Sequence, residues 1–475
     1  MSFVQLDYLP FLLVCVTAFV WSPRRVRGVL LLAASLGFYA YQSPVHTLLL
    51  LASAALDFGV GLGLERIDST GSARARKGLL ACSLVGNLSL LGVFKYASLF
   101  EDLVSRVTGA APPELGQVAA WTLPLGISFY TFQTISYSFD VFRRKIPACR
   151  NPLHYLLYVS FFPQLVAGPI ERAGRLLPQL VELRSPTTED FSHGTRLIAW
   201  GFFKKTVLAD RLKLYVWPVF ERPEAYGSFT LFFAATSMLV VLYLDFSAYT
   251  DIARGAARLF GVDLVDNFRR PFLSRSMGEF ASRWHISLFR WIGDYVHSPL
   301  SHGRMSHARL WRNNLLTMGL FGLWHGASWT FLLWGLGSGA AISVQNSMRL
   351  VRSQRGVRRP LRSRWGARDV AACLGTTLLA SVFVVFFFSP DVEFAARWFA
   401  SLGTWPAELD LAWLGWTALA LALGLAGQAL AEFRDLSAWW SRAGILGRAA
   451  WFALLLAALV YLRVPEPGEF IYFRF

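Results

Sequence analysis

Two histidines mark the part of the sequence in which chemistry could take place. His285 lies in the segment Arg-Trp-His-Ile-Ser, and His325 lies in the segment Gly-Leu-Trp-His-Gly. No formally charged residue occurs in 313–348, so His325 is the one side chain of that stretch that titrates near neutral pH. An imidazole accepts a proton from a hydroxyl group at this pH, which makes general-base catalysis the chemistry expected of this residue.

A second interpretation of His325 is structural. A polar side chain at membrane depth is costly unless a partner or a water-filled cavity satisfies it, and this favours a functional site. The imidazole could instead hydrogen-bond the backbone of a neighbouring helix. It could also lie with Trp324, Trp329 and Trp334 in an aromatic belt at the membrane surface. The residue types alone leave these interpretations open.

The composition predicts a polytopic membrane protein. Of the 475 residues, 55% are hydrophobic and only 16% are charged, whereas about 25% charged residues is usual in soluble domains. The net charge of +16 comes from short basic clusters between apolar runs, as in cytoplasmic loops, and this disfavours nucleic-acid binding. The four cysteines lie far apart without a C-x-x-C pair, which disfavours a zinc, redox or disulfide site.

Apolar runs along the chain predict the membrane-spanning segments. The expected spans are 9–21, 29–41, 45–64, 79–100, 118–142, 228–250, 370–388, 412–430 and 449–462. Basic loops alternate with acidic or uncharged ones, which places both the N-terminus and the tail 470–475 outside the cytoplasm. Several runs are shorter than the roughly 20 residues that cross a bilayer, so those helices tilt or thin the membrane locally.

Three segments of the middle third depart from simple spans. Pro163 and the Gly-Pro pair at 168–169 break an apolar run, so 166–172 is expected to form a re-entrant or cavity-lining turn. Asp245, inside an apolar run, should pair with a basic group or line a polar cavity, unless the helix ends before it. Segment 277–296 predicts one interfacial helix in which His285 shares a face with apolar residues and points into the protein. The alternative is an amphipathic anchor that leaves this histidine at the membrane surface.

Several ordered motifs resemble a known family. The segments DNFRRPF at 266–272, RWHISL at 283–288 and GLWHGASW at 322–329 resemble the signature of the membrane-bound O-acyltransferases. Segments 123–129, 167–170, 245–253 and the tail FIYFRF are similar to the bacterial alginate O-acetyltransferase branch of that family. Ala248 stands where this branch usually has glycine, and Ala281-Ser282 replaces bulky and basic residues, so the acceptor polymer is left open.

The resemblance implies a fold and a division of the chain. The implied fold is an all-α polytopic membrane protein, with a ring of roughly 11–13 transmembrane and re-entrant helices around a central tunnel. Residues 1–117 would form N-terminal membrane helices and 118–348 the catalytic core. Residues 349–369 would form a basic cytoplasmic loop, and 370–475 the C-terminal helices and the short aromatic tail.

The resemblance also implies roles for individual residues. His325 would be the catalytic base and His285 its second polar partner. Residues expected in the substrate tunnel are Trp324, Asp245, Asn267, Ser287 and Trp329. Tyr472, which lies outside the cytoplasm in the expected topology, is a candidate acyl relay, because a cytoplasmic acyl group needs a carrier to reach an extracytoplasmic acceptor. The other interpretation of Tyr472 is that the aromatic tail simply packs at the membrane surface.

The implied reaction moves an acyl group, most simply acetyl, from a cytoplasmic thioester such as acetyl-CoA to hydroxyls of an extracytoplasmic polysaccharide. The expected partners are membrane lipid, the donor, the polysaccharide and a periplasmic SGNH-type O-acetyltransferase, in the inner membrane of a bacterium. No bound cofactor and no metal is expected. The alternatives are D-alanyl transfer to a teichoic acid-type polymer, a transporter or flippase without acyl chemistry, and a lipid-binding scaffold.

Overall fold

In the computed structural model, helices make up all the regular structure of the described residues. These are residues 3, 7–68, 71–109, 124–165, 168–301, 306–354, 365–403 and 442–464, with single positions 415, 418, 422, 428, 440, 468, 470 and 471. The all-α class expected from the sequence is confirmed. The expected span 412–430 lies almost entirely outside the described residues.

The chain divides into two compact units. The first unit comprises Met1–Gly201 and Tyr249–Asp266, and the second comprises Phe202–Ala248 and Asn267–Phe475. The long helix α13 (Ser228–Leu259) contributes residues to both units. The segments that carry both histidines, Asp245 and the tail belong to the second unit.

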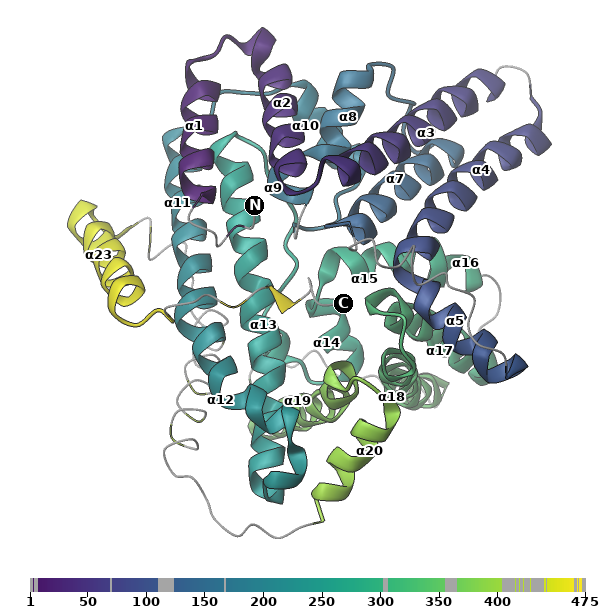
Figure 1. Ribbon diagram of the computed structural model, residues 1–475, viewed down its shortest axis with the longest axis vertical. Coiled ribbons are helices and arrows are strands. Elements are labelled where there is room, and N and C mark those ends of the chain that lie inside the picture. The colour runs from purple at the N-terminus through teal and green to yellow at the C-terminus, as the bar shows by residue number, and fades with distance from the viewer. Residues whose placement is uncertain are drawn as a thin grey trace. The chain divides into compact units, whose positions relative to one another are not determined.

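The first unit consists of short and long helices around a buried polar centre. Its helices are α1 (Tyr8–Trp21), α2 (Arg24–Gln42), α3 (Pro44–Asp68), α4 (Ala73–Leu91), η1 (Gly92–Tyr96), α5 (Ala97–Thr108), α7 (Ile127–Phe142), α8 (Pro152–Ser160), α9 (Phe162–Leu165), α10 (Ala173–Val181) and α11 (Thr188–Phe203). Helices α3, α4 and α7 pack against one another (Figure 1). The carboxylate of Asp57 on α3 accepts hydrogen bonds from Ser83, Asn87 and Ser138, which offset the cost of burying it.

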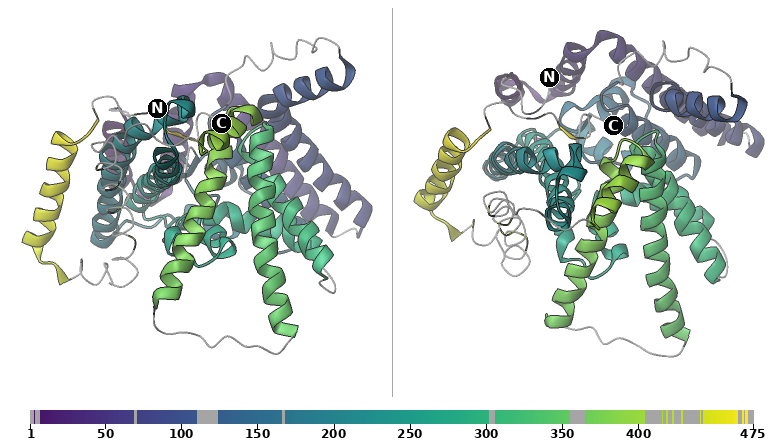
Figure 2. Two further views of the ribbon diagram at one scale, coloured as in Figure 1. Left: turned by 90° about the horizontal axis from the view of Figure 1, so that it is seen from below. Right: turned by 60° about the horizontal axis from the view of Figure 1, so that its bottom comes forward.

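The second unit contains the long C-terminal helices. Its elements are η2 (Lys204–Ala209), α12 (Asp210–Glu221), η3 (Pro223–Ala225), η4 (Pro271–Leu273), α14 (Met277–Arg283), α15 (Ile286–Ile292), η5 (Gly293–His297), α16 (Ser298–Leu300), α17 (His307–His325), α18 (Trp329–Gln354), α19 (Ala367–Phe388), α20 (Val392–Ser401) and α23 (Ile445–Tyr461). Helices α17 and α18 form a closely packed hairpin, and α18 and α19 lie side by side (Figure 2).

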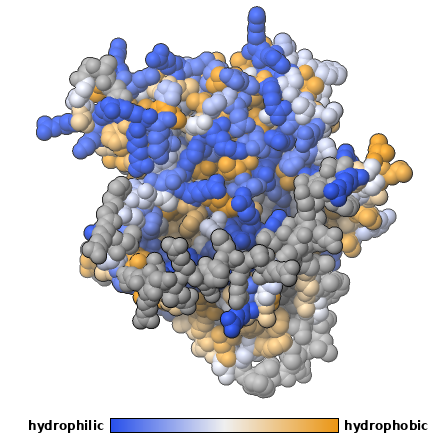
Figure 3. All heavy atoms as spheres, turned by 180° about the vertical axis from the view of Figure 1, so that it is seen from behind, coloured by the Kyte–Doolittle hydropathy of each residue, from blue (hydrophilic) through white to orange (hydrophobic). Residues whose placement is uncertain are grey.

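Four helices of the described chain are long and apolar enough to cross a membrane. They are Pro44–Ile67, Ala73–Tyr96, Ser228–Leu259 and Ala367–Phe388. The apolar helices α1 and α23 are shorter. Large apolar side chains such as Leu13, Leu48 and Leu454 are more than 60% exposed, and hydrophobic patches are visible on the outer surface (Figure 3). These features are those of a multi-pass membrane protein, as the composition predicts.

The prediction of one helix over 277–296 is wrong. Helix α14 ends at Arg283, and α15 begins at Ile286 after a reversal at His285, whose φ is +42°. A face analysis at 100° per residue therefore does not apply across this segment, although the inward position that it gave His285 agrees with the structure.

The break predicted around Pro163 is present. Helix α8 ends at Ser160, α9 covers only Phe162–Leu165, and Gly168 to Arg172 are not helical. Gly168 lies so close to the backbone of Gln164 that a side chain there would overlap it. Positions 166 and 167 lie outside the described residues. The membrane depth of this turn stays a prediction.

Candidate active site

His325 occupies the last position of α17 and is almost fully buried. The residue is 3% exposed. Ring centroids of Phe321, Trp324, Trp334 and Phe387 lie 5.0, 4.7, 5.0 and 5.1 Å from its own. The aromatic rings come from α17, α18 and α19, so three helices together exclude bulk water from this imidazole. This burial does not fit an exposed position in an aromatic belt at the membrane surface, whereas the catalytic role of His325 stays a prediction.

Close backbone contact fixes the helix that ends in His325. A Cβ atom at Gly322 would overlap the carbonyl oxygen of Phe331, and one at Gly335 would overlap that of Met318. Only glycine at these two positions lets α17 and α18 approach so closely, as in helix pairs of membrane proteins generally. We call α17 and α18 (His307–Gln354) the hairpin. Its glycine contact lies one turn from His325 and holds that residue in place.

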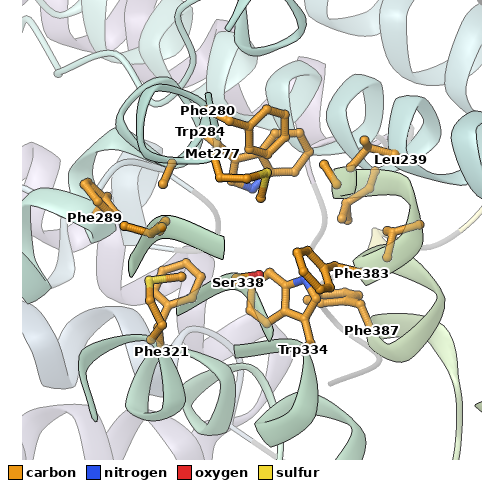
Figure 4. A pocket seen from close by; sticks show the side chains of 16 residues that line it. Leu239, Met277, Phe280, Trp284, Phe289, Phe321, Trp334, Ser338, Phe383 and Phe387 are labelled. Carbon is orange, nitrogen blue, oxygen red and sulfur yellow. The ribbon is translucent and has the colours of Figure 1, made fainter. Parts of the chain in front are cut away.

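An apolar cavity of about 60 Å³ is lined in part by the rings that surround His325. Phe321, Trp334 and Phe387, which surround the imidazole, also line this cavity (Figure 4). The other lining side chains are apolar or aromatic except for the hydroxyl of Ser338. The cavity therefore suits a small apolar group held against the rings that pack around the imidazole.

His285 is fully buried, in a turn that two backbone hydrogen bonds join to an earlier part of the same segment. The backbone N–H of Ile286 donates to the carbonyl of Asn267 at 2.9 Å, and the N–H of Arg269 donates to the carbonyl of Arg283 at 3.0 Å. These two bonds tie 267–269 to 283–286 and hold His285 in the left-handed region, where residues other than glycine are strained. We call 267–292 the bridged segment. Burial lowers the pKa of His285 to about 3, so the imidazole is neutral at physiological pH.

Asn267 and Ser287 are joined by a hydrogen bond within the bridged segment. The Oδ1 atom of Asn267 accepts from the N–H of Ser287 at 3.3 Å and so caps the first turn of α15. Both side chains are buried. Asn267 bonds the backbone of Ile286 and Ser287, which directly follow His285, so this contact helps to fix the position of the histidine.

One indole connects the two histidines. The ring of Trp324 lies 4.7 Å from that of His325 and 5.8 Å from that of His285. Phe246 on α13 packs edge-on against His285 at 4.7 Å. The structure therefore brings together His325, His285 and Trp324. Trp329, by contrast, is 42% exposed at the first residue of α18.

Asp245 belongs to a buried ionic cluster. Helix α13 does not end at Leu244 but continues through Asp245, which pairs with the ammonium of Lys205 at 2.6 Å. Lys205 also pairs with Asp210 at 2.7 Å. The expectation that Asp245 has a basic partner is confirmed, since a buried carboxylate in a membrane helix needs one.

The ionic cluster also holds the C-terminal segment. The backbone N–H of Ile471 donates to Oδ2 of Asp245 at 2.8 Å, and Phe470 and Ile471 are each 1% exposed. The ring of Phe470 lies 5.7 Å from that of Phe246, which in turn touches His285. The tail thus reaches the environment of this histidine. Tyr472 lies outside the described residues.

A family comparison identifies the reaction class of this chain. Residues 114–389, which include both histidines, match the family described as "MBOAT, membrane-bound O-acyltransferase family". The chain belongs to the membrane-bound O-acyltransferase family. As a member, it is an enzyme that takes an acyl group from a donor, as the motifs around His285 and His325 predict.

Curated relatives of this acyltransferase cover most of its length. The chain is 35% identical to the "Probable alginate O-acetylase AlgI" of Azotobacter vinelandii, over 81% of this chain and 74% of the relative. It is 32% identical to the protein of the same name from Pseudomonas putida, over 96% of each chain. It is also 32% identical to the "Peptidoglycan O-acetyltransferase" of Helicobacter pylori, over 67% of this chain and 64% of the relative.

Several residues around this candidate site were not predicted from the sequence. They are Lys205, the tail residue Phe470, and the rings of Phe246, Phe321 and Phe387. A lysine pair at 204–205 inside an otherwise apolar stretch was a usable signal, since buried cations require acidic partners. The phenylalanines gave no such signal, because the chain has 39 of them and their positions depend on tertiary packing.

Proposed function

We propose that this protein moves an acetyl group from a cytoplasmic thioester toward hydroxyl groups of an extracytoplasmic polysaccharide, with His325 as the general base. One observation carries the proposal: a buried imidazole whose aromatic neighbours Phe321, Trp334 and Phe387 also line an apolar cavity. A base at this place meets two requirements at once, exclusion of water and space for an acyl group.

In the proposed reaction His325 takes the proton of an acceptor hydroxyl. The hydroxyl oxygen attacks the thioester carbonyl, a new C–O bond forms, and the C–S bond breaks as the tetrahedral intermediate collapses. The proton returns from His325 to the departing sulfur, so the imidazole ends neutral. A positioned base of this kind contributes about 10²- to 10⁴-fold to the rate.

Acetyl is the acyl group that the site and the relatives favour. The lining of the cavity contains no acidic side chain among the described residues, so the ammonium group of a D-alanyl substrate would be buried there without a counter-charge. A "Teichoic acid D-alanyltransferase" of Bacillus subtilis is 30% identical, but over only 45% of this chain. The alginate and peptidoglycan O-acetylating relatives match over larger shares.

The proposal includes a direction. The donor is a cytoplasmic thioester such as acetyl-CoA, the acceptor is an extracytoplasmic polysaccharide, and the protein lies in the cytoplasmic membrane of a bacterium. Tyr472 is the proposed relay: its phenol oxygen receives the acetyl group as an ester and passes it to an extracytoplasmic acetyltransferase of the SGNH type. The anchoring of the preceding residues Phe470 and Ile471 beside Asp245 and Phe246 supports a defined place for this tail.

Proteoliposomes supplied with acetyl-labelled acetyl-CoA test the chemistry. The wild-type protein should transfer label to itself or to added polysaccharide, and His325→Ala should lower the transfer at least about 100-fold. His307→Ala is the matched control, because His307 lies on the same helix and is exposed. Equal activity of the two variants would remove His325 from the mechanism.

Tyr472→Phe tests the relay separately. This change keeps the aromatic ring and removes the oxygen that would carry the acetyl group. Label on the protein and on the polymer should both disappear, while release of free CoA by hydrolysis persists. Unchanged acetylation of the polymer would leave only a packing role for the tail.

A further inference from the structure

One hydroxyl group in the apolar cavity has no role in the chemistry described so far. Ser338 lies on α18, is 4% exposed, and is the one residue of the described lining whose side chain ends in an oxygen. Figure 4 shows this residue among aromatic rings and aliphatic side chains. Its hydroxyl makes no hydrogen bond with any residue that the structure describes.

Other buried serines in neighbouring helical turns behave differently. Ser343 on α18 donates to the carbonyl of Gly339 at 2.8 Å, and Ser381 on α19 donates to that of Thr377 at 2.9 Å. A bond to the preceding turn is a common way for a serine inside a helix to satisfy its hydroxyl. Ser338 lacks such a bond, and burying a hydroxyl without a partner costs free energy. A ligand that accepts a hydrogen bond in the cavity would offset this cost.

Contacts on two sides of α18 fix the direction in which Ser338 points. On one side, Gly335 and Gly339 lie so close to the backbone of α17 that little room is left for a side chain. On the other side, Gly337 lies against the ring of Phe383 on α19, and this ring also lines the cavity. Helices in such close contact do not rotate about their axes without losing it, so Ser338 stays turned toward the cavity.

Ser338 also has a defined relation to His325. It follows Trp334 by four residues, a rise of about 6 Å along the helix, so the two side chains are neighbours on one face of α18. Both line the cavity, and the Trp334 ring lies 5.0 Å from the ring of His325. A hydrogen-bond donor and a base that neighbour the same indole can act on one reacting group.

We propose that the hydroxyl of Ser338 donates a hydrogen bond to the carbonyl oxygen of the acetyl thioester. This inference rests on the proposed function and adds a residue to it. When the acceptor oxygen attacks the carbonyl carbon, the carbonyl oxygen becomes negatively charged, and a donor already aimed at it stabilises that charge where water is excluded. Ser338 gives up no proton, because the charge returns to the C=O bond as the C–S bond breaks.

Ser338→Ala removes this hydroxyl and changes little else. CoA release by the full chain in proteoliposomes is followed over a range of acetyl-CoA concentrations. The value of kcat should fall about 100-fold with KM nearly unchanged, since the hydrogen bond strengthens mainly in the transition state. The thermal unfolding temperature should stay the same or rise, because the variant no longer buries a hydroxyl without a partner.

Two further variants make the test specific. Ser381→Ala is the matched control, because its hydroxyl is equally buried but does not line the cavity, and its kcat should equal that of the wild-type protein. Ser338→Cys separates hydrogen bonding from packing. A thiol fills at least the space of the hydroxyl but is a weak donor, so kcat should fall as it does in the alanine variant.

Four results would overturn the inference. They are wild-type kcat in either Ser338 variant, a loss that appears in KM alone, a larger fall in unfolding temperature for Ser338→Ala than for Ser381→Ala, and acetyl label on the peptide that contains Ser338. The last result would make the serine a covalent acceptor. Activity that His325→Ala loses but the Ser338 variants retain contradicts only the hydrogen bond. Activity that His325→Ala retains contradicts the general base, and the Ser338 variants then still decide on the hydrogen bond.

Discussion

The hairpin and the bridged segment each carry a buried histidine, but different contacts fix their backbones. In the hairpin, Gly322 and Gly335 bring two long helices into backbone contact, and His325 follows at the end of a regular helix. In the bridged segment, two hydrogen bonds to 267–269 and neighbouring rings hold His285 in a left-handed conformation. Close packing of long helices is stiff, whereas a short turn depends on each of its few contacts.

From this comparison we expect different tasks for the two histidines. The stiffly held His325 lies beside the cavity, which suits a base that must keep its distance to reacting atoms. His285 lies between Trp324 and Phe246, and so influences the site through the indole and through the ring that touches the tail. We expect substitutions in the hairpin to affect the chemical step. Substitutions in the bridged segment should instead affect how Trp324 and the tail residue Phe470 are positioned.

The largest effect is expected from Gly322→Ala. The new methyl group would overlap the Phe331 carbonyl, and backbone atoms cannot move aside as a flexible side chain can. The free energy of unfolding should fall by about 3 kcal/mol, and acyl transfer should fall with it. Gly375→Ala is the control, since it adds the same methyl group to α19 where no atom lies within 4 Å. Equal unfolding midpoints for both variants would contradict a hairpin held by backbone contact.

A smaller effect is expected from Asp245→Asn. This change weakens the anchoring of Phe470 and Ile471, and Phe470 contacts the ring of Phe246, which packs against His285. The amide still offers an oxygen to the N–H of Ile471 but lacks the charge that pairs with Lys205. Lys205 keeps Asp210 as a partner, so the loss should be about 2 kcal/mol, below that for a fully orphaned buried ion. Protease cleavage near residue 464 should become faster, and polymer acetylation should fall more than acetyl-CoA hydrolysis. Equal losses of both activities would mean that the tail does not act at the transfer step.

The smallest effect is a change in pH dependence. His285 has a pKa of about 3 in the folded chain and about 6.5 when exposed, so the unfolded chain binds more protons between these values. The free energy of unfolding should therefore fall as the pH drops below 6.5, by about 1.4 kcal/mol per pH unit. His285→Gln should flatten this slope in urea titrations at pH 5 to 6.5, and exposed His307→Gln should leave it unchanged. A slope that His285→Gln leaves intact would show that this imidazole is not desolvated.

The sequence predicted more of the hairpin than of the bridged segment. The uncharged stretch 313–348 already indicated an imidazole at membrane depth, but the glycine contact that packs α17 against α18 was not predicted. The break at His285 depends on hydrogen bonds to residues almost twenty positions earlier, which no helical periodicity contains. For the same reason the basic partner of Asp245 was expected from the cost of burying a charge, but its identity as Lys205 was not. The role of Tyr472 as an acyl relay stays a prediction.

The backbone contact between Gly322 and Gly335 also limits how the site can open. Two helices that touch without intervening side chains cannot slide or separate without losing that contact along its length, so α17 and α18 should move as one body. In the proposed mechanism, entry of a substrate beside His325 then requires displacement of the side chains around it, among them Phe387 of α19. Gating of this enzyme is therefore expected in the rotamers of a few phenylalanines, on a timescale faster than helix rearrangement.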